Sequence, residues 1–505
     1  MDRNTRMAQI TVRDLMAESG VAFGTSGARG TVIAMTDRVC YGYTRGFLSY
    51  LAGLGEFPAG GRIALAGDLR PSTPRILAAC ARAVRDSGGV PVFCGYVPTP
   101  ALALYSFAQG IPSLMVTGSH IPADRNGIKF YRPHGEVLKE DEAGMSAQLV
   151  DLPSFTFTAE GMLAEAEVLP PVTDVETAYV QRYIDHFGAG ALGGKRIGIY
   201  QHSAVGRDIL ARIVRELGAE AVLLGRSETF IPVDTEAIRD EDVILARDWA
   251  SQGAFDAIIS TDGDSDRPLL ADETGIWMRG DVLGILSAAR VGAAAVVTPV
   301  SSNTALELSG LFPRCRRTRI GSPYVIAAMS EERTTPGEVV CGYEANGGFL
   351  LGSDIPGADG TTTTALPTRD AVLPILLVLT VPGSSVSAQL ASLPQRVTFS
   401  DRIKAFAPEL GEKLFGMLQA GSAEQQLALQ TDLFGASAGE ASTIDATDGI
   451  RTTFASGEII HLRRSGNAPE LRCYTEADSE ARAVTLNREA LTSVKAALGL
   501  SHAES

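Results

Sequence analysis

The stretch MVTGSHIPADRNGIKFY, from Met115 to Tyr131, carries the clearest strand and loop pattern of the chain. An apolar run ends at Val116, a polar loop with a glycine follows, and Asp124 to Gly127 turn the chain back into a second apolar run. Apolar runs bounded by Gly, Asn and Asp are typical of strands, and these polar residues favour a reversal of the chain between them. The interpretation is that the loop displays Ser119 at the end of a buried strand.

The same order of elements occurs three times. Each time an apolar strand is followed by a helix with apolar residues every three to four positions, and then by short strands, the last of which ends in a polar loop with glycine. The three regions begin at Arg62, Lys195 and Ala293, and their final loops read TGSH, DGDSDR and YEANGG. Strands that alternate with helices indicate α/β units. Because ligands bind beyond the carboxyl ends of strands in such sheets, we expect the three loops to meet in one cleft.

At 505 residues the chain is too long for one core, because single hydrophobic cores stop growing at about 250–300 residues. After Gln395 the pattern changes to separate short strands and a closing helix, which predicts a smaller domain. The expected fold class is α/β, with three related α/β domains on mixed sheets and a smaller C-terminal α+β domain around one central cleft. The expected domains are residues 1–155 with the serine loop, 170–272 with the DGDSDR loop, 273–385 with the YEANGG loop and 396–505 with a basic loop.

The composition limits the class of partner. Hydrophobic residues make up 45% of the chain and charged residues 20%, which is typical of a globular protein. The net charge of −15 argues against a broad nucleic-acid surface or binding to an anionic membrane, since either needs clustered Lys and Arg. A small phosphorylated substrate needs only a few cations in a cleft. The sequence leaves open whether the protein is a monomer or a homodimer.

The six cysteines are far apart and show no CxxC spacing, so the sequence signals neither a disulfide framework nor a zinc site. They are expected to be buried apolar residues in a reducing compartment. The first twenty residues lack the apolar core of a signal peptide, and no later run reaches transmembrane length. The expected location is the cytoplasm.

Ser119 is the first candidate for chemistry. An isolated Gly-Ser is usually only a turn with a capping serine. Here the serine follows a strand end, has His120 beside it and has Lys129 on the returning strand. A hydroxyl near cationic groups can accept and keep a phosphoryl group.

The segment ISTDGDSDRPLL places Asp262, Asp264 and Asp266 at alternate positions. Three close carboxylates repel one another unless a cation lies between them, and oxygen-only ligands suit Mg²⁺ or Ca²⁺. A calcium EF-hand loop does not match, because its sixth position is Arg267 rather than glycine and a strand precedes it. We expect a metal site rather than a solvated acidic turn, and Mg²⁺ rather than Ca²⁺ because Mg²⁺ favours phosphate-bearing sites.

Two further loops supply polar groups. CGYEANGGF contains Glu344 and Asn346, which can hydrogen-bond sugar hydroxyls, although the loop alone also fits a simple hairpin turn. HLRRSGNAPELR combines arginines, a hydroxyl, an amide and glycine, which are the groups of a phosphate cradle; a solvated basic turn is the alternative.

Four motifs now stand together: FGTSGARG at 23–30, TGSHIPADRNGIKFY at 117–131, DGDSDR at 262–267 and RRSGNAPELR at 463–472. In these motifs and their order the chain resembles the α-D-phosphohexomutase family, the phosphomannomutases and phosphoglucomutases, over nearly its whole length. Any one motif could arise by chance, whereas all four in order make the match specific. The resemblance implies four domains around a single deep cleft.

The resemblance also implies a role for each matching residue. It identifies Ser119 as the serine that carries the phosphoryl group and, with Asp262, Asp264 and Asp266, as a ligand of Mg²⁺. The cationic groups around the transferring phosphoryl group would be Arg29, His120, Lys129 and Arg267, with Lys129 a candidate general acid/base. The substrate would be bound by Glu344 and Asn346 at the sugar and by Arg463, Ser465, Gly466 and Asn467 at the phosphate that is not transferred.

The implied enzyme is a phosphomutase of the isomerase class that interconverts hexose 1-phosphate and hexose 6-phosphate through a phosphoserine and a hexose 1,6-bisphosphate. Phosphomannomutase is the expected activity, with phosphoglucomutase and phosphoglucosamine mutase as alternatives. A Mg-dependent sugar phosphatase and a non-enzymatic sugar-phosphate sensor are more remote. Two departures concern the sugar: many relatives have Gly-Glu-x-Ser-Gly-His where this chain has YEANGG, and some have histidine where it has Ser322.

Overall fold

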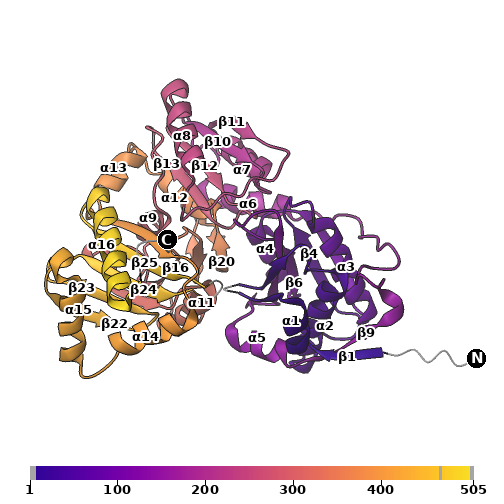
Figure 1. The fold of residues 1–505 in the computed structure, drawn as a ribbon. Helices are drawn as coiled ribbons and strands as arrows, with labels where there is room; N and C mark the ends of the chain where they lie inside the picture. Colours follow the sequence, from indigo (N-terminus) through magenta and orange to yellow (C-terminus); the bar gives the residue numbers. More distant parts are fainter. Residues whose placement is uncertain (1–6, 25, 466–468, 501–505) are drawn as a thin grey trace, which may run out of the picture.

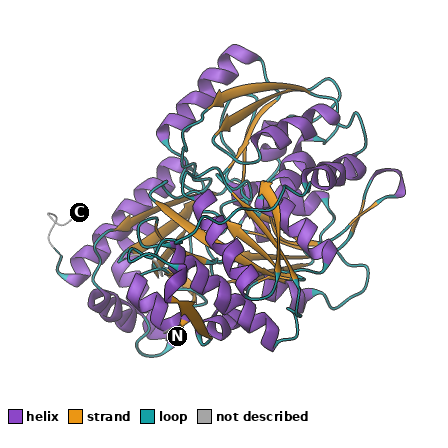
Figure 2. Ribbon diagram, turned by 90° about the vertical axis from the view of Figure 1, so that its right-hand side faces the viewer, coloured by secondary structure: helices purple, strands orange, loops and turns teal. Residues whose placement is uncertain are grey.

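The computed structural model describes residues 7–24, 26–465 and 469–500, and it is organised around four main sheets. In Figure 1 the N-terminal region lies on the right, the second region at the top and the C-terminal region on the left. Figure 2 shows helices packed on the sheets in the view from the side. The predicted four-domain α/β fold class is confirmed, while the residue bounds predicted for each domain stay a prediction.

The first region has a seven-stranded mixed sheet in the order β2-β3-β7-β6-β4-β5, with β8 paired to β7. A separate antiparallel pair, β1 with β9, closes the two ends of the region against each other. Its elements are β1 (Met7–Thr11), α1 (Val12–Ser19), β2 (Ala22–Phe23), β3 (Ala28–Thr31), α2 (Asp37–Gly53), β4 (Arg62–Gly67), α3 (Thr73–Asp86), β5 (Val90–Tyr96), α4 (Thr99–Gln109), β6 (Ser113–Val116), β7 (Arg125–Arg132), β8 (Gly135–Glu136), α5 (Lys139–Ser146), β9 (Leu149–Pro153) and the 3-10 helix η1 (Ser154–Thr156).

The second region has a four-stranded sheet in the order β11-β10-β12-β13, and the third has a five-stranded sheet in the order β15-β14-β16-β17-β20. The second comprises α6 (Glu176–Phe187), β10 (Arg196–His202), α7 (Arg207–Glu216), β11 (Glu220–Arg226), α8 (Asp240–Gly253), β12 (Ala257–Thr261) and β13 (Pro268–Ala271). The third comprises α9 (Gly280–Arg290), β14 (Ala295–Pro299), α10 (Ala305–Leu308), β15 (Arg314–Thr318), α11 (Ser322–Glu332), β16 (Val340–Tyr343), β17 (Phe349–Leu351), β18 (Ile355–Pro356), η2 (Ala358–Gly360), β19 (Thr362–Thr363), β20 (Leu366–Asp370), α12 (Val372–Leu379) and α13 (Val386–Ala391).

The three α/β regions share one strand arrangement around the functional loops. In each region a central strand pairs in parallel with a second strand, and the second strand pairs antiparallel with the strand that follows it in the sequence. The parallel pairs are β4 with β6, β10 with β12 and β14 with β16, and the antiparallel pairs are β6 with β7, β12 with β13 and β16 with β17. TGSH, DGDSDR and YEANGG are therefore the same connection in three copies. This confirms the expectation that the three units are related.

The fourth region is a five-stranded antiparallel sheet in the order β21-β25-β24-β23-β22, against which α16 packs. Its elements are β21 (Val397–Ile403), α14 (Pro408–Leu418), α15 (Ala423–Ala438), β22 (Ala441–Asp445), β23 (Ile450–Phe454), β24 (Ile459–Arg464), β25 (Leu471–Ala477) and α16 (Glu480–Leu498).

Local sequence explains these elements. A strand in a sheet that is covered on both faces needs apolar residues at consecutive positions. The strand β4 shows this, since five of its six residues are buried. In α3, Ile76, Cys80 and Val84 recur at helical spacing and are buried, and Pro74 stands in the first turn, where a proline costs no hydrogen bond.

The first three regions share one large hydrophobic cluster, whereas the fourth region has a separate one. One apolar cluster contains Ala101 of the first region, Tyr179 of the second and Leu283 of the third, so these regions are joined by buried contacts. The fourth region has a cluster of its own around Phe434 and Leu486. The first three regions therefore form a common frame to which the fourth is added.

All six cysteines are free, as their spacing predicts, and all but Cys315 are buried. Within the part of the chain that the structure describes, no helix has the length and apolar character needed to cross a bilayer.

Candidate active site

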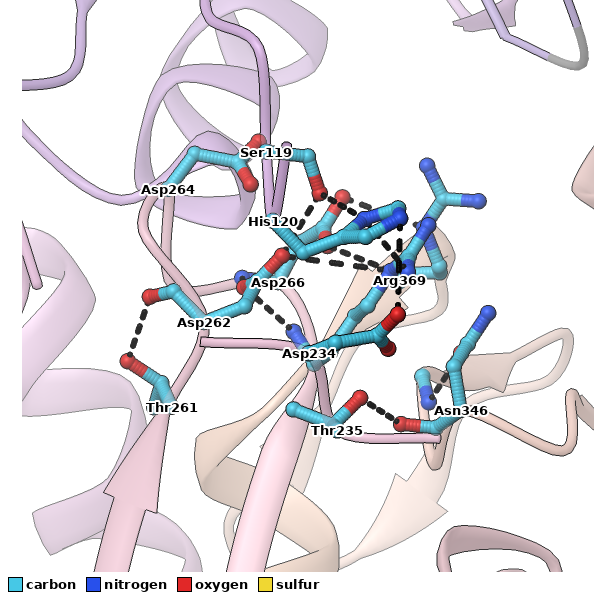
Figure 3. A network of polar contacts seen from close by, with 12 residues as sticks. Ser119, His120, Asp234, Thr235, Thr261, Asp262, Asp264, Asp266, Asn346 and Arg369 are labelled. Carbon is cyan, nitrogen blue, oxygen red and sulfur yellow. Dashed lines mark hydrogen bonds and ion pairs between the residues drawn. The ribbon is translucent and has the colours of Figure 1, made fainter. Parts of the chain in front are cut away.

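Ser119 lies in the loop between β6 and β7. Its backbone has φ = +57°, a left-handed conformation that residues other than glycine adopt uncommonly. Its amide donates to Thr117 Oγ1 at 2.7 Å, and its Oγ donates to Asp262 Oδ2 at 2.6 Å (Figure 3). Ser119 is only 1% exposed, so the expectation that the loop displays this hydroxyl is wrong. The hydroxyl is instead aimed at the acidic loop of the second region.

The three aspartates of the DGDSDR loop form one buried cluster between β12 and β13. One carboxylate oxygen of each lies within 4.8 Å of the others, and all three residues are fully buried. Lys129 Nζ donates to Asp264 at 2.6 Å and also to Asp266, and Thr99 Oγ1 donates to Asp264. The structure thus brings the predicted metal ligands, Ser119 and Lys129 together.

The electrostatics of the cluster differ from one carboxyl to the next. Burial raises the pKa of Asp262, and the neighbouring carboxylates Asp264 and Asp266 raise it further. Burial acts in the same direction on Asp266, but Arg369 and Lys129 outweigh it and lower the pKa of that carboxyl.

Two oxygens of the cluster suit a cation. Asp264 Oδ1 and Asp266 Oδ1 are buried and have no hydrogen-bond partner among the described residues. A buried carboxylate oxygen without a partner is costly, and a site of oxygen atoms alone suits a hard divalent cation. The residues therefore fit a divalent metal.

Cationic groups surround the serine and the acidic cluster. Arg267 Nη1 donates to His120 Nδ1 at 2.9 Å, and because arginine can only donate, Nδ1 is the acceptor and Nε2 carries the hydrogen of the neutral ring. His120 Nε2 lies 3.8 Å from Asp234 Oδ2. Burial and the nearby Arg267 lower the pKa of His120 to about 3. Burial, together with the smaller effect of the positive charges of Arg267 and Arg369, lowers the pKa of Arg29 to about 10.

One arginine connects the YEANGG loop to the DGDSDR loop, residues 262–267, which is called the metal loop below. Arg369, on β20, donates from Nε to Asp266 Oδ2 at 3.0 Å and from Nη1 to Glu344 Oε2 at 3.0 Å. Asn346 is held from the second region, since Thr235 Oγ1 donates to its carbonyl at 2.7 Å (Figure 3). Its side-chain oxygen accepts from the Gly348 amide, so its NH₂ group is the part that can donate to a ligand.

Ser322, the second departure from the family pattern, is fully buried. Its Oγ donates to Glu136 Oε2 at 2.9 Å and accepts from Arg369 Nη1 at 3.1 Å. In this chain the residue links the first and third regions.

The fourth region contributes the basic loop. Arg463, on β24, donates from Nε to Asp448 Oδ2 at 2.8 Å, and the same oxygen accepts the Ile320 amide of the third region. The Ser465 amide donates to Glu470 O at 2.9 Å, which closes the base of the loop. The predicted phosphate-binding residues Gly466 and Asn467 lie outside the described residues.

All four regions line one cavity of about 820 Å³. The described residues around it include the predicted groups His120, Arg267, Glu344 and Asn346. Among the described residues, six arginines line it: Arg29, Arg125, Arg267, Arg369, Arg402 and Arg472. Four acidic residues also line it: Asp234, Glu236, Glu344 and Asp401. In a chain of net charge −15 this local excess of arginine makes the cavity suited to a phosphorylated ligand.

Several cavity residues are absent from the candidates found in the sequence. Asp234 and Glu236 precede α8 in a segment without a chemical motif, and Arg369 stands alone at the end of a strand. Arg472 belongs to the basic motif, and its signal was the run of arginines around it. For Asp234, Glu236 and Arg369 the sequence offers only single charged residues, which are common on any protein surface.

Comparisons with known proteins agree with this architecture. Family models for phosphoglucomutase/phosphomannomutase match as α/β/α domain I at residues 20–150, α/β/α domain III at 279–397 and the C-terminal domain at 420–492. A phosphomannomutase of Salmonella muenchen is 43% identical over 96% of this chain and 98% of its own length. A phosphomannomutase of Sinorhizobium fredii is 44% identical over 91% of this chain and 95% of its own length.

Solved structures show the same fold. A phosphoglucomutase/phosphomannomutase family protein from Burkholderia thailandensis has a TM-score of 0.69 at 19% identity and covers 94% of this chain and 97% of its own. Two structures of the Aspergillus fumigatus N-acetylphosphoglucosamine mutase, one with GlcNAc-6P and magnesium and one with glucose 1,6-bisphosphate, have TM-scores of 0.56 and 0.54 at 15% identity. They cover 97% and 98% of this chain and all of their own. The family models, the two relatives and the four-region architecture together establish that this chain belongs to the phosphoglucomutase/phosphomannomutase family.

Proposed function

We propose that this chain is a phosphohexomutase, and specifically a phosphomannomutase, that interconverts hexose 1-phosphate and hexose 6-phosphate. The observation that carries the proposal is the hydrogen bond from Ser119 Oγ to Asp262, within a buried three-carboxylate cluster and beside a cavity lined by six arginines. The relatives named phosphomannomutase support the choice of sugar.

In the proposed reaction, phosphorylated Ser119 gives its phosphoryl group to the free hydroxyl of the bound hexose phosphate. The seryl O–P bond breaks, a sugar O–P bond forms, and the proton of the sugar hydroxyl passes by way of an acid/base group to the seryl oxygen. The hexose 1,6-bisphosphate then reorients in the cavity, and its other phosphoryl group returns to Ser119. A glucose 1,6-bisphosphate complex among the structural neighbours supports such an intermediate. Lys129 is the candidate acid/base, because its Nζ contacts two carboxylates of the cluster that Ser119 faces.

Asp262, Asp264, Asp266 and an oxygen of the seryl phosphate would hold Mg²⁺, which when bound neutralises charge on the transferring group. The oxygen-only donor set and the magnesium in one structural neighbour support the choice of metal. Arg29 and Arg267 would donate N–H groups to the equatorial oxygens of the phosphoryl group. His120, whose Nδ1 accepts from Arg267 and lies 3.4 Å from Ser119 Oγ, would hold that guanidinium beside the serine.

The sugar would be recognised through Glu344 and Asn346. We expect them to bind the hydroxyls at C3 and C4, which are equatorial in both glucose and mannose, so that mannose 1-phosphate and glucose 1-phosphate both turn over. Galactose 1-phosphate has an axial C4 hydroxyl and should be slower by about 100-fold or more in kcat/KM, because a polar partner is left unpaired. N-acetylglucosamine phosphate should be poor because of its bulky C2 substituent.

A coupled assay of the purified protein against these sugar 1-phosphates tests both the function and the recognition. Equal kcat/KM for galactose and glucose 1-phosphates would contradict the role of Glu344, and failure to isomerise any of the sugars would contradict the proposed function. Release of inorganic phosphate at the rate of isomerisation would favour a phosphatase instead.

Arg463→Ala should raise KM for the sugar phosphate with little change in kcat, since Arg463, with Ser465, Gly466 and Asn467, is proposed to bind the phosphate that is not transferred. Loss of a charge-assisted hydrogen bond costs about 1.5–3 kcal/mol, which corresponds to a rise of tenfold or more. Steady-state kinetics with mannose 1-phosphate measure the effect.

The matched control is Arg464→Ala. Neighbouring residues of a strand point to opposite faces, and Arg464 packs over the Phe415 ring, with 5.7 Å between its Cζ and the ring centroid. Its KM should stay near the wild-type value. Equal KM values for the two variants would refute the proposal that Arg463 binds the phosphate that is not transferred, called the distal phosphate below.

We further propose that the protein works in the cytoplasm. Six free cysteines, five of them buried, support a reducing compartment.

A further inference from the structure

Arg70 is one of the largest fully buried side chains, at 1% exposed, although arginine is among the residues least often buried. It lies between β4 and α3 and follows Asp68, to which its Nε donates at 3.0 Å. Neither residue has a part in the reaction proposed above. A buried charge of this kind needs every one of its N–H groups satisfied.

The rest of the guanidinium is bonded to the serine loop. Its four remaining N–H groups match four backbone carbonyls of that loop: from Nη1 to Pro122 O at 2.7 Å and Arg125 O at 3.0 Å, and from Nη2 to Ser119 O at 2.9 Å and Ile121 O at 2.5 Å. With the bond to Asp68, all five donors of the side chain are used. One side chain therefore binds the carbonyl of the reactive serine and three carbonyls of the segment that follows it.

The guanidinium is enclosed tightly. A Cβ atom at Gly118 would lie 2.6 Å from Arg70 Cζ, so a larger residue before the serine would displace the arginine. On another side the ring of Phe230, from the second region, lies with its centroid 4.1 Å from Arg70 Cζ. A Cβ at Gly263 of the metal loop would lie 2.7 Å from Ser119 O and 3.1 Å from the Phe230 ring. The serine loop and the metal loop thus meet at this arginine.

We propose that Arg70 is a positioning residue for phosphoryl transfer. Its guanidinium holds the loop carbonyls so that Ser119 keeps its left-handed backbone and its Oγ stays aimed at Asp262. The inference rests on the proposed function, because the hydroxyl it positions is the one that would carry the phosphoryl group. Lysine cannot replace Arg70, since an ammonium has three donors and lacks the planar fork that reaches four carbonyls.

Arg70→Lys is the main test. We expect kcat to fall by about 100-fold, the scale of a displacement of about 1 Å in the reacting groups. KM for mannose 1-phosphate should stay within about twofold, because the sugar and distal-phosphate groups are untouched. The rate at which glucose 1,6-bisphosphate phosphorylates Ser119, followed by intact mass, should fall in the same ratio as kcat.

The matched control is Arg182→Lys. Arg182 is also buried and donates to the Thr364 carbonyl at 2.8 Å, away from the serine loop. This variant should lose thermal stability and keep wild-type kcat. Wild-type kcat in Arg70→Lys, or losses in both variants that only follow the folded fraction, would overturn the proposal.

Gly118→Ala provides a second variant, in case Arg70→Lys does not fold. Gly118 is not among the left-handed glycines, so alanine brings no backbone strain, and its Cβ acts by displacing the guanidinium. It should lower kcat and leave KM unchanged. Where both single variants fold, the double variant should be no slower than Arg70→Lys alone, and additive losses would contradict the shared mechanism.

The two ideas fail separately. A wild-type protein that isomerises no hexose phosphate contradicts the proposed function. A crystal structure of Arg70→Lys or Gly118→Ala in which Ser119 keeps its left-handed backbone and its bond to Asp262 contradicts the positioning role, whatever the activity.

Discussion

Ser119→Ala should reduce turnover of mannose 1-phosphate by about 10⁴-fold or more, the scale of losses when a nucleophile is removed. Without the hydroxyl there is no atom to carry the phosphoryl group between the two sugar positions. The fold should survive, because Ser119 Oγ makes one short hydrogen bond, to Asp262, and a longer contact of 3.4 Å to His120 Nδ1. Coupled kinetics and a thermal melt measure the two effects.

Ser113→Ala is the matched control for the serine. Ser113 lies on β6, is fully buried, and its Oγ donates to Ser106 Oγ at 3.1 Å. Its turnover should stay close to that of the wild type. Intact-mass analysis adds a direct test: a wild-type protein that is active with a bisphosphate primer but never carries a phosphoryl group at Ser119 would show the mechanism to be wrong.

Asp264→Asn should weaken the affinity for Mg²⁺ by about 100-fold or more, since even residues that only orient a metal ligand contribute 10–100-fold. The change removes one of three formal charges from the cluster. In the wild type the Lys129 ammonium donates to Asp264 Oδ2. The variant puts a neutral amide there, whose NH₂ group cannot accept that hydrogen bond. Calorimetry and the dependence of activity on added Mg²⁺ measure the loss.

Thr99→Val is the comparison for the metal site. Thr99 donates to Asp264 Oδ2 without belonging to the cluster, so its loss should weaken Mg²⁺ binding by about tenfold. The affinity for Mg²⁺ should therefore be highest in the wild type, lower in Thr99→Val and lowest in Asp264→Asn. Full activity of the wild type after exhaustive chelation would refute the assignment of a metal.

Much of the fold follows from local patterns. The buried strands β4, β10 and β14 each open a repeat as a run of mostly apolar residues, and such a run needs no partner to be identified. The polar loops that follow β6, β12 and β16 stand out because polar or charged residues and glycine directly follow a buried strand. Both signals lie within about ten residues, which is the range that periodicity can cover.

The site was only partly predictable, because its contacts are remote in sequence. Lys129 and Asp266 are 137 positions apart, and Arg369 and Asp266 are 103 positions apart. The motifs identify the chemistry of the first pair. A lone arginine at the end of β20 gives no comparable sign, and Arg70, in a turn, looks like an ordinary solvated charge until its five donors are counted.

The degree of exposure was the least predictable property. A Gly-Ser at a strand end indicates a displayed hydroxyl, yet the metal loop of another region packs on Ser119 and buries it. Arg463 shows the same limit, since a motif cannot reveal that Asp448 already pairs with its guanidinium.

The three α/β repeats, the smaller C-terminal domain and the serine, acidic and sugar loops can be identified from the residues alone, because hydrophobic period and strand-end polarity are local properties of the chain. The three-dimensional packing was needed to show that Ser119 is buried against Asp262, that Lys129 lies between two aspartates and that Arg70 and Arg369 contact the loops. These features depend on contacts between residues 49 to 143 positions apart, because a buried charged or polar group needs partners and most of them come from other segments of the chain.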